Sequence, residues 1–372
     1  MNTRPTPALF APLTLGPMTV PNRIAVAPMC QYSADDGSAT DWHMQHWMSL
    51  AMSGAGMVTI EATGVERHGR ITHGCLGLYS DHNEDAAKRT LTAARRVAPH
   101  GTRFGVQIAH AGRKASVHIP WKGGKPLGAD EDAWQAVGPS AVPYAPDWPA
   151  PRALDDDGIQ RVISHFVLAA ERAVRAGFDF IEIHGAHGYL IHSFLSPVAN
   201  KRTDHWGGSL ENRMRLVLAI AGGVRAAVPD HIAVGIRLSV TDWVKDGFNP
   251  DEAVVVARAL KEAGLVYVCC SSGGVAHNQK LTPGPGYQVH LAERVRSEAG
   301  IPTRAVGLID DPHQAEEIIA GGRADMVALA RALLADPRWP WRAAAALGQP
   351  VHPVSQYATA AATIARWAQP VA

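Results

Sequence analysis

Three polar side chains on one short stretch of the sequence could act together on a substrate. His184, His187 and Tyr189 stand in the run His-Gly-Ala-His-Gly-Tyr, and its glycines indicate a loop. Two imidazoles can donate hydrogen bonds to an oxygen that gains negative charge, and a phenol can deliver a proton. A His-x-x-His pair can also bind a metal, but no third ligand of clear type is nearby. Tyr189 taken alone could equally be a packing residue.

A second set of residues is typical of an anion site. Gly307 follows one predicted strand, and Ala330-Arg331 stand where a later strand gives way to a helix. Backbone N–H groups at a glycine turn and at a helix N-terminus bind phosphate well. The alternatives are that Gly307 only forms a tight turn and that Arg331 is a surface cation. Arg237, at the end of another predicted strand, could pair with a structural carboxylate instead of a ligand.

The four cysteines are Cys30, Cys75, Cys269 and Cys270. They are too few and too scattered for a disulfide framework, and no Cys-x-x-Cys pair is present for zinc or an iron–sulfur cluster. We interpret Cys75 and the 269–270 pair as buried small hydrophobes. Cys30 follows the first strand of the predicted barrel, so its thiol either faces the site or packs as a small side chain.

The elements that must position these residues are short apolar or β-branched runs that alternate with helical patterns. Asn249-Pro250 and Asp311-Pro312 predict helix starts, and Gly177, Gly264 and Gly300 predict helix ends. The alternation favours a parallel sheet. The predicted strands cover residues 24–27, 57–61, 104–109, 178–184, 233–238, 267–271, 303–306 and 326–329.

Eight strands that are each followed by a helical segment predict an α/β protein with a single (β/α)8 (TIM) barrel. A doubly wound sheet is the alternative, but no Gly-x-Gly-x-x-Gly follows any predicted strand. In such barrels the site lies at the C-terminal ends of the strands. Residues 116–151 are rich in Gly, Pro, Trp and Asp and are too long for an idle connection, so we expect them to cap one mouth. We expect residues 1–372 to form one domain.

Composition narrows the classes of partner. Among 372 residues the formal net charge is +1, whereas nucleic-acid binding normally requires a strongly basic face. No apolar run is long enough to cross a bilayer, and residues 1–12 lack the apolar core of a signal peptide. We therefore expect a cytoplasmic protein with no nucleic-acid and no membrane partner.

A long, nearly gap-free string resembles the signature of the Old Yellow Enzyme family of flavoproteins. It runs from His184-Gly185-Ala186-His187-Gly188-Tyr189 to Gly207-Gly208-Ser209-Leu210-Glu211-Asn212-Arg213, and the resemblance extends from about Leu9 to Pro337. Pro21-Asn22-Arg23-Ile24, Ala27-Pro28-Met29 and Ala305-Val306-Gly307 match the family's first and seventh strands. Cys30 with Tyr32, and the two histidines, resemble the thermophilic-like subgroup, which includes xenobiotic reductases. Ala330 departs from the usual Gly, and Trp206 from the usual Tyr.

The resemblance implies an FMN-dependent NADPH dehydrogenase or ene-reductase, with NADPH, or else NADH, as hydride donor. It implies that the substrates are alkenes conjugated to a carbonyl or nitro group (enones and nitroalkenes). The implied catalytic residues are Tyr189 as proton donor and the His184–His187 pair. The implied cofactor-binding residues are Ala27, Pro28, Met29, Cys30, Ala62, Gln107, Arg237, Gly307, Ala330 and Arg331, and the implied substrate-binding residues are Tyr32, His184, Gly185, Ala186, His187, Tyr189 and Trp367. No metal is implied.

The resemblance also implies assembly as a homodimer or a dimer-based tetramer, in which a C-terminal Arg or Trp enters the neighbouring site. Arg366-Trp367 follows an Ala-rich stretch that we predict to be helical, and the alternative is a tail packed on its own barrel. Three rival functions remain at this stage. They are a dienoyl-CoA-reductase-like flavoenzyme, which would need an iron–sulfur segment, a metal-dependent TIM-barrel lyase or hydrolase, and a non-catalytic flavin-binding protein.

Overall fold

The fold is a closed barrel of eight parallel strands, seen in a computed structural model that describes residues 5–351 and 353–367. The TIM-barrel prediction is confirmed, and the doubly wound alternative is wrong. All eight predicted strands are present, with ends that differ by at most a few residues. In barrel order they are β3 (Ile24–Val26), β4 (Met57–Gly64), β5 (Arg103–Ala109), β8 (Phe180–Gly185), β9 (Ala233–Ser239), β10 (Val268–Ser271), β11 (Thr303–Ala305) and β12 (Met326–Leu329).

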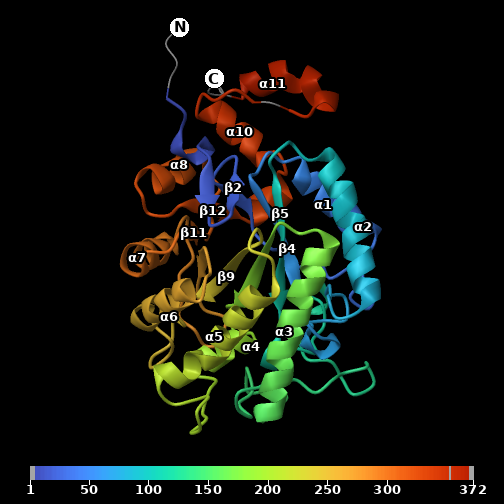
Figure 1. Ribbon diagram of the computed structural model, residues 1–372, viewed down its shortest axis with the longest axis vertical. Helices are drawn as coiled ribbons and strands as arrows, with labels where there is room; N and C mark the ends of the chain where they lie inside the picture. Colours follow the sequence, from blue (N-terminus) through green and yellow to red (C-terminus); the bar gives the residue numbers. More distant parts are fainter. Residues whose placement is uncertain (1–4, 352, 368–372) are drawn as a thin grey trace.

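Helices surround this barrel (Figure 1). They begin and end where the caps predict: the Asn249 side chain accepts hydrogen bonds from the N–H groups of Asp251 and Glu252, and Gly177 ends a helix at a φ of 98°. None of the helices in the described part of the chain is long and apolar enough to cross a membrane. The helices are α1 (Asp41–Ala51), α2 (Asp81–Val97), α3 (Asp156–Ala176), α4 (Leu190–Leu195), α5 (Leu210–Ala227), α6 (Pro250–Glu262), α7 (Val289–Ala299), α8 (Pro312–Ala320), α9 (Arg331–Ala335), α10 (Trp339–Ala346) and α11 (Ala361–Arg366).

Alternate residues of each strand serve two separate cores. One set packs with the helices in the larger core, for example Val106, Ile181 and Val234. The other set, which includes Phe180 and Tyr267, points into the barrel and packs on a two-stranded hairpin at its N-terminal end, formed by β1 (Leu13–Leu15) and β2 (Met18–Val20). Because side chains alternate across a strand, both faces of these strands are buried, which explains their nearly continuous apolar sequences.

An ion pair is buried inside the barrel. Arg304 on β11 and Glu182 on β8 are both fully buried and in contact. The carboxylate of Glu182 also accepts hydrogen bonds from Gln107 Nε2 at 2.8 Å and from the Tyr267 hydroxyl at 3.1 Å. Arg304 donates further to Thr59 Oγ1 at 3.2 Å. These contacts satisfy both charges inside the barrel and link four of its strands, β4, β5, β8 and β11.

Residues 116–151 and the C-terminal tail lie at opposite ends of the molecule (Figure 1). The 116–151 segment reaches the C-terminal mouth, where Trp121 packs edge-on against Tyr32 with ring centroids 5.8 Å apart. It contains the short strand β6 (Val137–Gly138), which pairs with β7 (Arg152–Ala153) directly after the segment. The predicted tail helix is present as α11, and its Ile364 packs on α10 of the same chain. Residues 368–372, the end of the predicted domain, lie outside the described residues.

We expect Arg304→Met to lower the free energy of unfolding by about 3–5 kcal/mol, because it leaves the Glu182 carboxylate buried without its counter-charge. Adding Glu182→Gln removes that charge but keeps an acceptor for Gln107, so the double variant should be more stable than Arg304→Met alone. Urea titration of the wild type, both single variants and the double variant measures this coupling. Simple addition of the two single losses would contradict it.

Candidate active site

Strand register brings the predicted site residues to one mouth of the barrel. Ala62 on β4 lies opposite Gln107 on β5, and His184 on β8 lies opposite Arg237 on β9. Ala27, just beyond β3, donates its N–H to Leu329 O of β12 at 2.9 Å, which extends the closure of the barrel up to the site. Because parallel strands end at the same edge, residues far apart in sequence become neighbours here.

A β-bulge in β4 sets which side chain faces the site. The pairing passes directly from Ile60 to Ala62, so Glu61 is the extra residue. Glu61 is buried away from Gln107 and accepts a hydrogen bond from Gln31 N at 2.9 Å, with His43 Nε2 of α1 at 3.5 Å. The sequence prediction ended this strand at residue 61 and missed the bulge. The bulge places the small Ala62 beside Gln107 and uses Glu61 to hold the loop that carries Cys30 and Tyr32.

The His184–Tyr189 turn brings its three polar rings into contact. The His184 ring centroid lies 5.1 Å from that of His187 and 5.0 Å from that of Tyr189, both edge-on. His187 has a φ of 62°, which is costly for a residue with a side chain. Gly188 (φ 76°) passes so close to Gly274 that a Cβ on Gly188 would lie 2.1 Å from Gly274 O, so only glycine fits.

Both histidines are neutral at neutral pH. Burial, and then the charge of Arg237, hold the pKa of His184 and of His187 well below the usual value of 6.5. His184 Nδ1 accepts a hydrogen bond from Ala186 N at 3.2 Å, so its proton is on Nε2. His187 Nε2 lies 2.7 Å from Ser271 Oγ, and Arg237 donates to that same oxygen at 3.5 Å. The Ser271 hydroxyl can therefore donate to His187 Nε2, which leaves Nδ1–H of His187 free to donate.

Tyr189 and the thiol of Cys30 are both protonated. Burial raises the pKa of Tyr189 well above 10, and the neighbouring Cys30 and Tyr32 raise it further. Burial likewise raises the pKa of Cys30 well above 9. Tyr189 therefore holds a proton that it can give up only when a strongly basic atom faces it. A protonated Cys30 is a poor nucleophile, in accord with a role beside a cofactor or in packing.

The prediction missed Lys114, which follows β5 in the short helix Gly112–Lys114. Its Nζ donates to His187 O at 2.9 Å and to Gly274 O at 3.0 Å. It also lies 4.6 Å from the ring centroid of Tyr144 and 5.2 Å from that of Tyr189. The only sequence signal was its position, five residues beyond the end of a barrel strand. The prediction also missed Ser271, the last residue of the predicted strand 267–271.

A cavity of about 550 Å³ adjoins these residues. Its walls include His187 and Arg237 together with Gly307, Ala330 and Arg331. Gly307 has a φ of 124°, and a Cβ there would lie 2.9 Å from Gln288 Nε2, so the position favours glycine. Arg331 begins α9, whose first N–H groups have no partner within the helix. Within the described part of the chain, the buried Nε of Arg237 also has no hydrogen-bond partner. The donors suit an elongated ligand with an anionic end.

One predicted site residue lies elsewhere in this chain. Trp367 directly follows α11, which lies at the opposite end of the molecule from the 116–151 segment (Figure 1), and it is 43% exposed. Its predicted contact with substrate therefore requires the site of another copy. No group of three or more His, Cys, Asp or Glu side chains among the described residues is arranged to hold a metal ion.

Comparison with known proteins agrees with this geometry. A family model described as the NADH:flavin oxidoreductase / NADH oxidase family matches residues 8–349. The NADPH dehydrogenase of Geobacillus sp. (strain WCH70) is 41% identical over 351 residues, which are 94% of this chain and 97% of that protein. Among solved structures, morphinone reductase superposes with a TM-score of 0.75 at 28% identity, covering 94% of this chain and 91% of that one. A 2-naphthoyl-CoA reductase superposes with a TM-score of 0.81 at 27% identity, but this chain covers only 53% of its length.

The pH dependence of stability tests the environment of Lys114. Burial, with the nearby charge of Arg113, lowers the pKa of Lys114 from 10.5 to about 8. The folded state thus holds the Lys114 proton more weakly than the unfolded chain does. Below pH 8 the buried ammonium therefore lowers the free energy of unfolding. This penalty disappears as the pH rises towards 10.5. We expect the wild type to gain up to about 3 kcal/mol relative to Lys114→Met over this range. Urea titrations of both proteins at several pH values measure the gain, and a constant difference would contradict it.

Proposed function

The chain belongs to the NADH:flavin oxidoreductase (Old Yellow Enzyme) family and is a flavin-dependent NADPH dehydrogenase, and we propose that it uses FMN to reduce the C=C bond of enones and nitroalkenes. The observation that carries the proposal is the contact of two neutral histidines with a protonated tyrosine, beside a cavity that His187 and Arg237 help to line. A reduction of this kind needs two donors for the substrate oxygen and one proton for carbon. His184, His187 and Tyr189 offer these groups within one turn.

The residues that line the cavity fit FMN. The backbone at Gly307, the start of α9 and the Arg331 side chain would hold the phosphate. Arg237, whose Nε has no partner within the described residues, would meet the electron-rich pyrimidine edge. The small side chains of Ala27 and Ala62 leave room for a flat ring. When bound, FMN would supply the redox chemistry: it would accept a hydride from NADPH, or from NADH, and give it to the alkene.

The chain's own side chains act on the substrate oxygen and on the carbon that receives the proton. The Nε2–H of His184 and the Nδ1–H of His187 would donate to the carbonyl or nitro oxygen, where negative charge develops. Neutral imidazoles suit this role, because each donates without giving up a proton at neutral pH. Tyr189 would then deliver its proton to the α-carbon, and Lys114 below its ring supports the developing phenolate. Trp121 and Tyr32 would help to shield this step from water.

The rival functions account for fewer of these features. A flavoenzyme of the dienoyl-CoA-reductase type would need a cysteine-rich segment for its iron–sulfur cluster, and the four cysteines of this sequence include no Cys-x-x-Cys pair. A metal-dependent lyase would need a set of metal ligands, and no group of three or more His, Cys, Asp or Glu side chains among the described residues is arranged to supply one. A non-catalytic flavin-binding protein would not need Tyr189 and both histidines in contact.

Replacing Tyr189 with Phe tests the proposal. NADPH oxidation by the FMN-loaded variant should remain within about threefold of the wild type, whereas reduction of 2-cyclohexenone should slow by roughly 10²-fold or more, because only the second half-reaction needs the proton. Stopped-flow measurement of the flavin absorbance separates the two half-reactions. A nitroalkene is the matched control, since its product can take the proton later from water and should lose less. A variant slowed only in the NADPH step would overturn the role of Tyr189.

We further propose that the protein forms a homodimer, or a tetramer built from two such dimers, in which the tail with Arg366 and Trp367 enters the neighbour's site. The exposed Trp367 supports this, since its own chain leaves 43% of it uncovered. Trp offers a rigid apolar wall and Arg a cation for a carbonyl.

Hybrid dimers test the shared site. Mixing a Tyr189→Phe protein with a protein that lacks residues 365–372 should yield hybrids with one complete site, so activity should rise above that of both parents. Native mass spectrometry confirms that hybrids form. Absence of a rise in proven hybrids would leave the tail as packing on its own barrel.

A further inference from the structure

We propose that His192 and Asp242 are positioning residues that hold the His187–Gly188–Tyr189 turn in its active shape. The inference rests on the proposed function, since it concerns the turn that would bind and protonate the substrate. Neither residue reaches the cavity, because His192 and Asp242 are both fully buried behind the turn. Their effect on the reaction must therefore pass through the backbone of Gly188.

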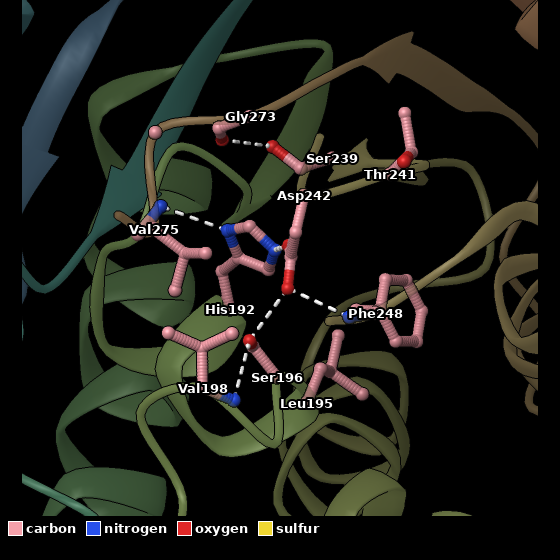
Figure 2. Close-up of polar contacts among 12 residues, drawn as sticks. His192, Leu195, Ser196, Val198, Ser239, Thr241, Asp242, Phe248, Gly273 and Val275 are labelled. Carbon is pink, nitrogen blue, oxygen red and sulfur yellow. Dashed lines mark hydrogen bonds and ion pairs between the residues drawn. The ribbon is translucent and has the colours of Figure 1, made fainter. Parts of the chain in front are cut away.

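A continuous chain of hydrogen bonds links the turn to a buried carboxylate (Figure 2). Gly188 N–H donates to His192 Nδ1 at 2.8 Å, and His192 Nε2 lies 2.8 Å from Asp242 Oδ1. Because Nδ1 accepts, the imidazole is neutral and its proton lies on Nε2, directed at the carboxylate. The negative charge of Asp242 polarises the ring and makes Nδ1 a better acceptor, just as carboxylates do for histidines that bind metals.

Asp242 is itself fixed on its other oxygen. Ser196 Oγ donates to Asp242 Oδ2 at 2.6 Å, and Phe248 N–H donates to the same oxygen at 2.7 Å. Burial alone would raise the pKa of Asp242, but the interactions with His192, Ser196 and the Phe248 N–H lower it below 3.8. The carboxylate is therefore ionised at neutral pH and has a defined orientation.

The combination of Ser, His and Asp does not form a nucleophilic triad. In such a triad the histidine contacts the serine hydroxyl as its base. Here Ser196 donates to the aspartate, and the histidine nitrogen that would act as base is occupied by the Gly188 amide. The cluster is also closed to solvent, with Ser196 fully buried. Its geometry suits support of a backbone, not attack on a substrate.

The turn needs such support because its backbone is strained. His187 and Gly188 both have positive φ values, of 62° and 76°. Such a conformation persists only where neighbouring groups hold it. His187 N is held by Ser239 Oγ at 3.0 Å, and Ser193 Oγ donates to Gly188 O at 2.9 Å. The His192 ring accepts from the N–H of Gly188, which lies between His187 and Tyr189. His192 itself is part of α4, which begins directly after Tyr189.

Two replacements of His192 separate positioning from bulk stability. The Oδ1 of His192→Asn can occupy the place of Nδ1 and accept from Gly188, although it cannot reach Asp242. His192→Leu fills the space but offers no acceptor. The probe is 4-hydroxybenzaldehyde, a phenol that would need both donor histidines. In FMN-loaded protein, we expect His192→Leu to bind it at least about tenfold more weakly than the wild type does. The affinity of His192→Asn for it should stay within about threefold of the wild-type affinity. The flavin difference spectrum reports this binding.

Asn200→Ala is the matched control. Asn200 is also buried just beyond α4, where its Nδ2 donates to Phe194 O and to Trp206 O, each at 2.8 Å, but it does not touch the turn. Its loss should lower the melting temperature about as much as His192→Leu does and leave affinity for the phenol unchanged. Equal losses of affinity in Asn200→Ala and His192→Leu, or none in either, would reduce His192 to a stabilising residue and overturn the proposal.

Hydrogen exchange of the FMN-loaded protein without ligand keeps this inference separate from the proposed function. The peptide that contains Gly188 should exchange at least about tenfold faster in His192→Leu than in the wild type, and at the wild-type rate in Asn200→Ala. Unchanged exchange in His192→Leu would overturn the positioning role whatever the enzyme reduces. A different outcome would be faster exchange in His192→Leu together with a wild type that neither binds the phenol nor reduces 2-cyclohexenone. That outcome would overturn the proposed function and leave the anchoring of Gly188 intact.

Discussion

The hydrogen bonds between β12 and β3 close the sheet on itself, and the rest of the structure depends on that closure. Val327 donates to Arg23 O at 3.0 Å and Ala27 to Leu329 O at 2.9 Å, so the first and last strands of the barrel share one ladder. An open sheet would leave these backbone groups unpaired and would separate Ala27 from Arg331. Closure instead puts the ends of eight strands around one space, in which a flavin and a substrate can be contacted from every side.

Within that space, the positive charges decide how the other groups titrate. Arg237 and Lys114 lie close to the paired histidines, so a second positive charge on either imidazole is unfavourable, and burial acts in the same direction. A buried carboxylate with a histidine beside it lies behind each of the two loops that carry functional side chains. Glu61 and His43 lie behind the loop of Tyr32, and Asp242 and His192 lie behind the turn of Tyr189. The mouth is thus cationic, which suits a ligand with a phosphate and an electron-rich ring, and Asp242 places a negative charge in the layer behind it.

Much of this arrangement could be predicted from the sequence, and the remainder shows what a sequence conceals. The strands were readable because burial on both faces leaves continuous apolar runs, and the helix ends because Asn249 and Gly177 have local reasons to be there. Lys114 was missed because the two carbonyls it holds lie 73 and 160 residues away, so that no local pattern marks it. The bulge at Glu61 was missed for a related reason, since an extra residue in one strand is defined only by its pairing with another.

That bulge divides β4 into two halves of opposite phase. Below Glu61, odd-numbered residues such as Met57 and Thr59 face the inside of the barrel, whereas above it the even-numbered Ala62 does. A change of one residue in register inverts which side chains face inward. Without the bulge, the alternation of β4 would turn the Glu61 carboxylate towards the flavin pocket. The lower half can then follow the packing demands of the core while the upper half follows the demands of the ligand. Evolution can alter either half without forcing a compensating change in the other.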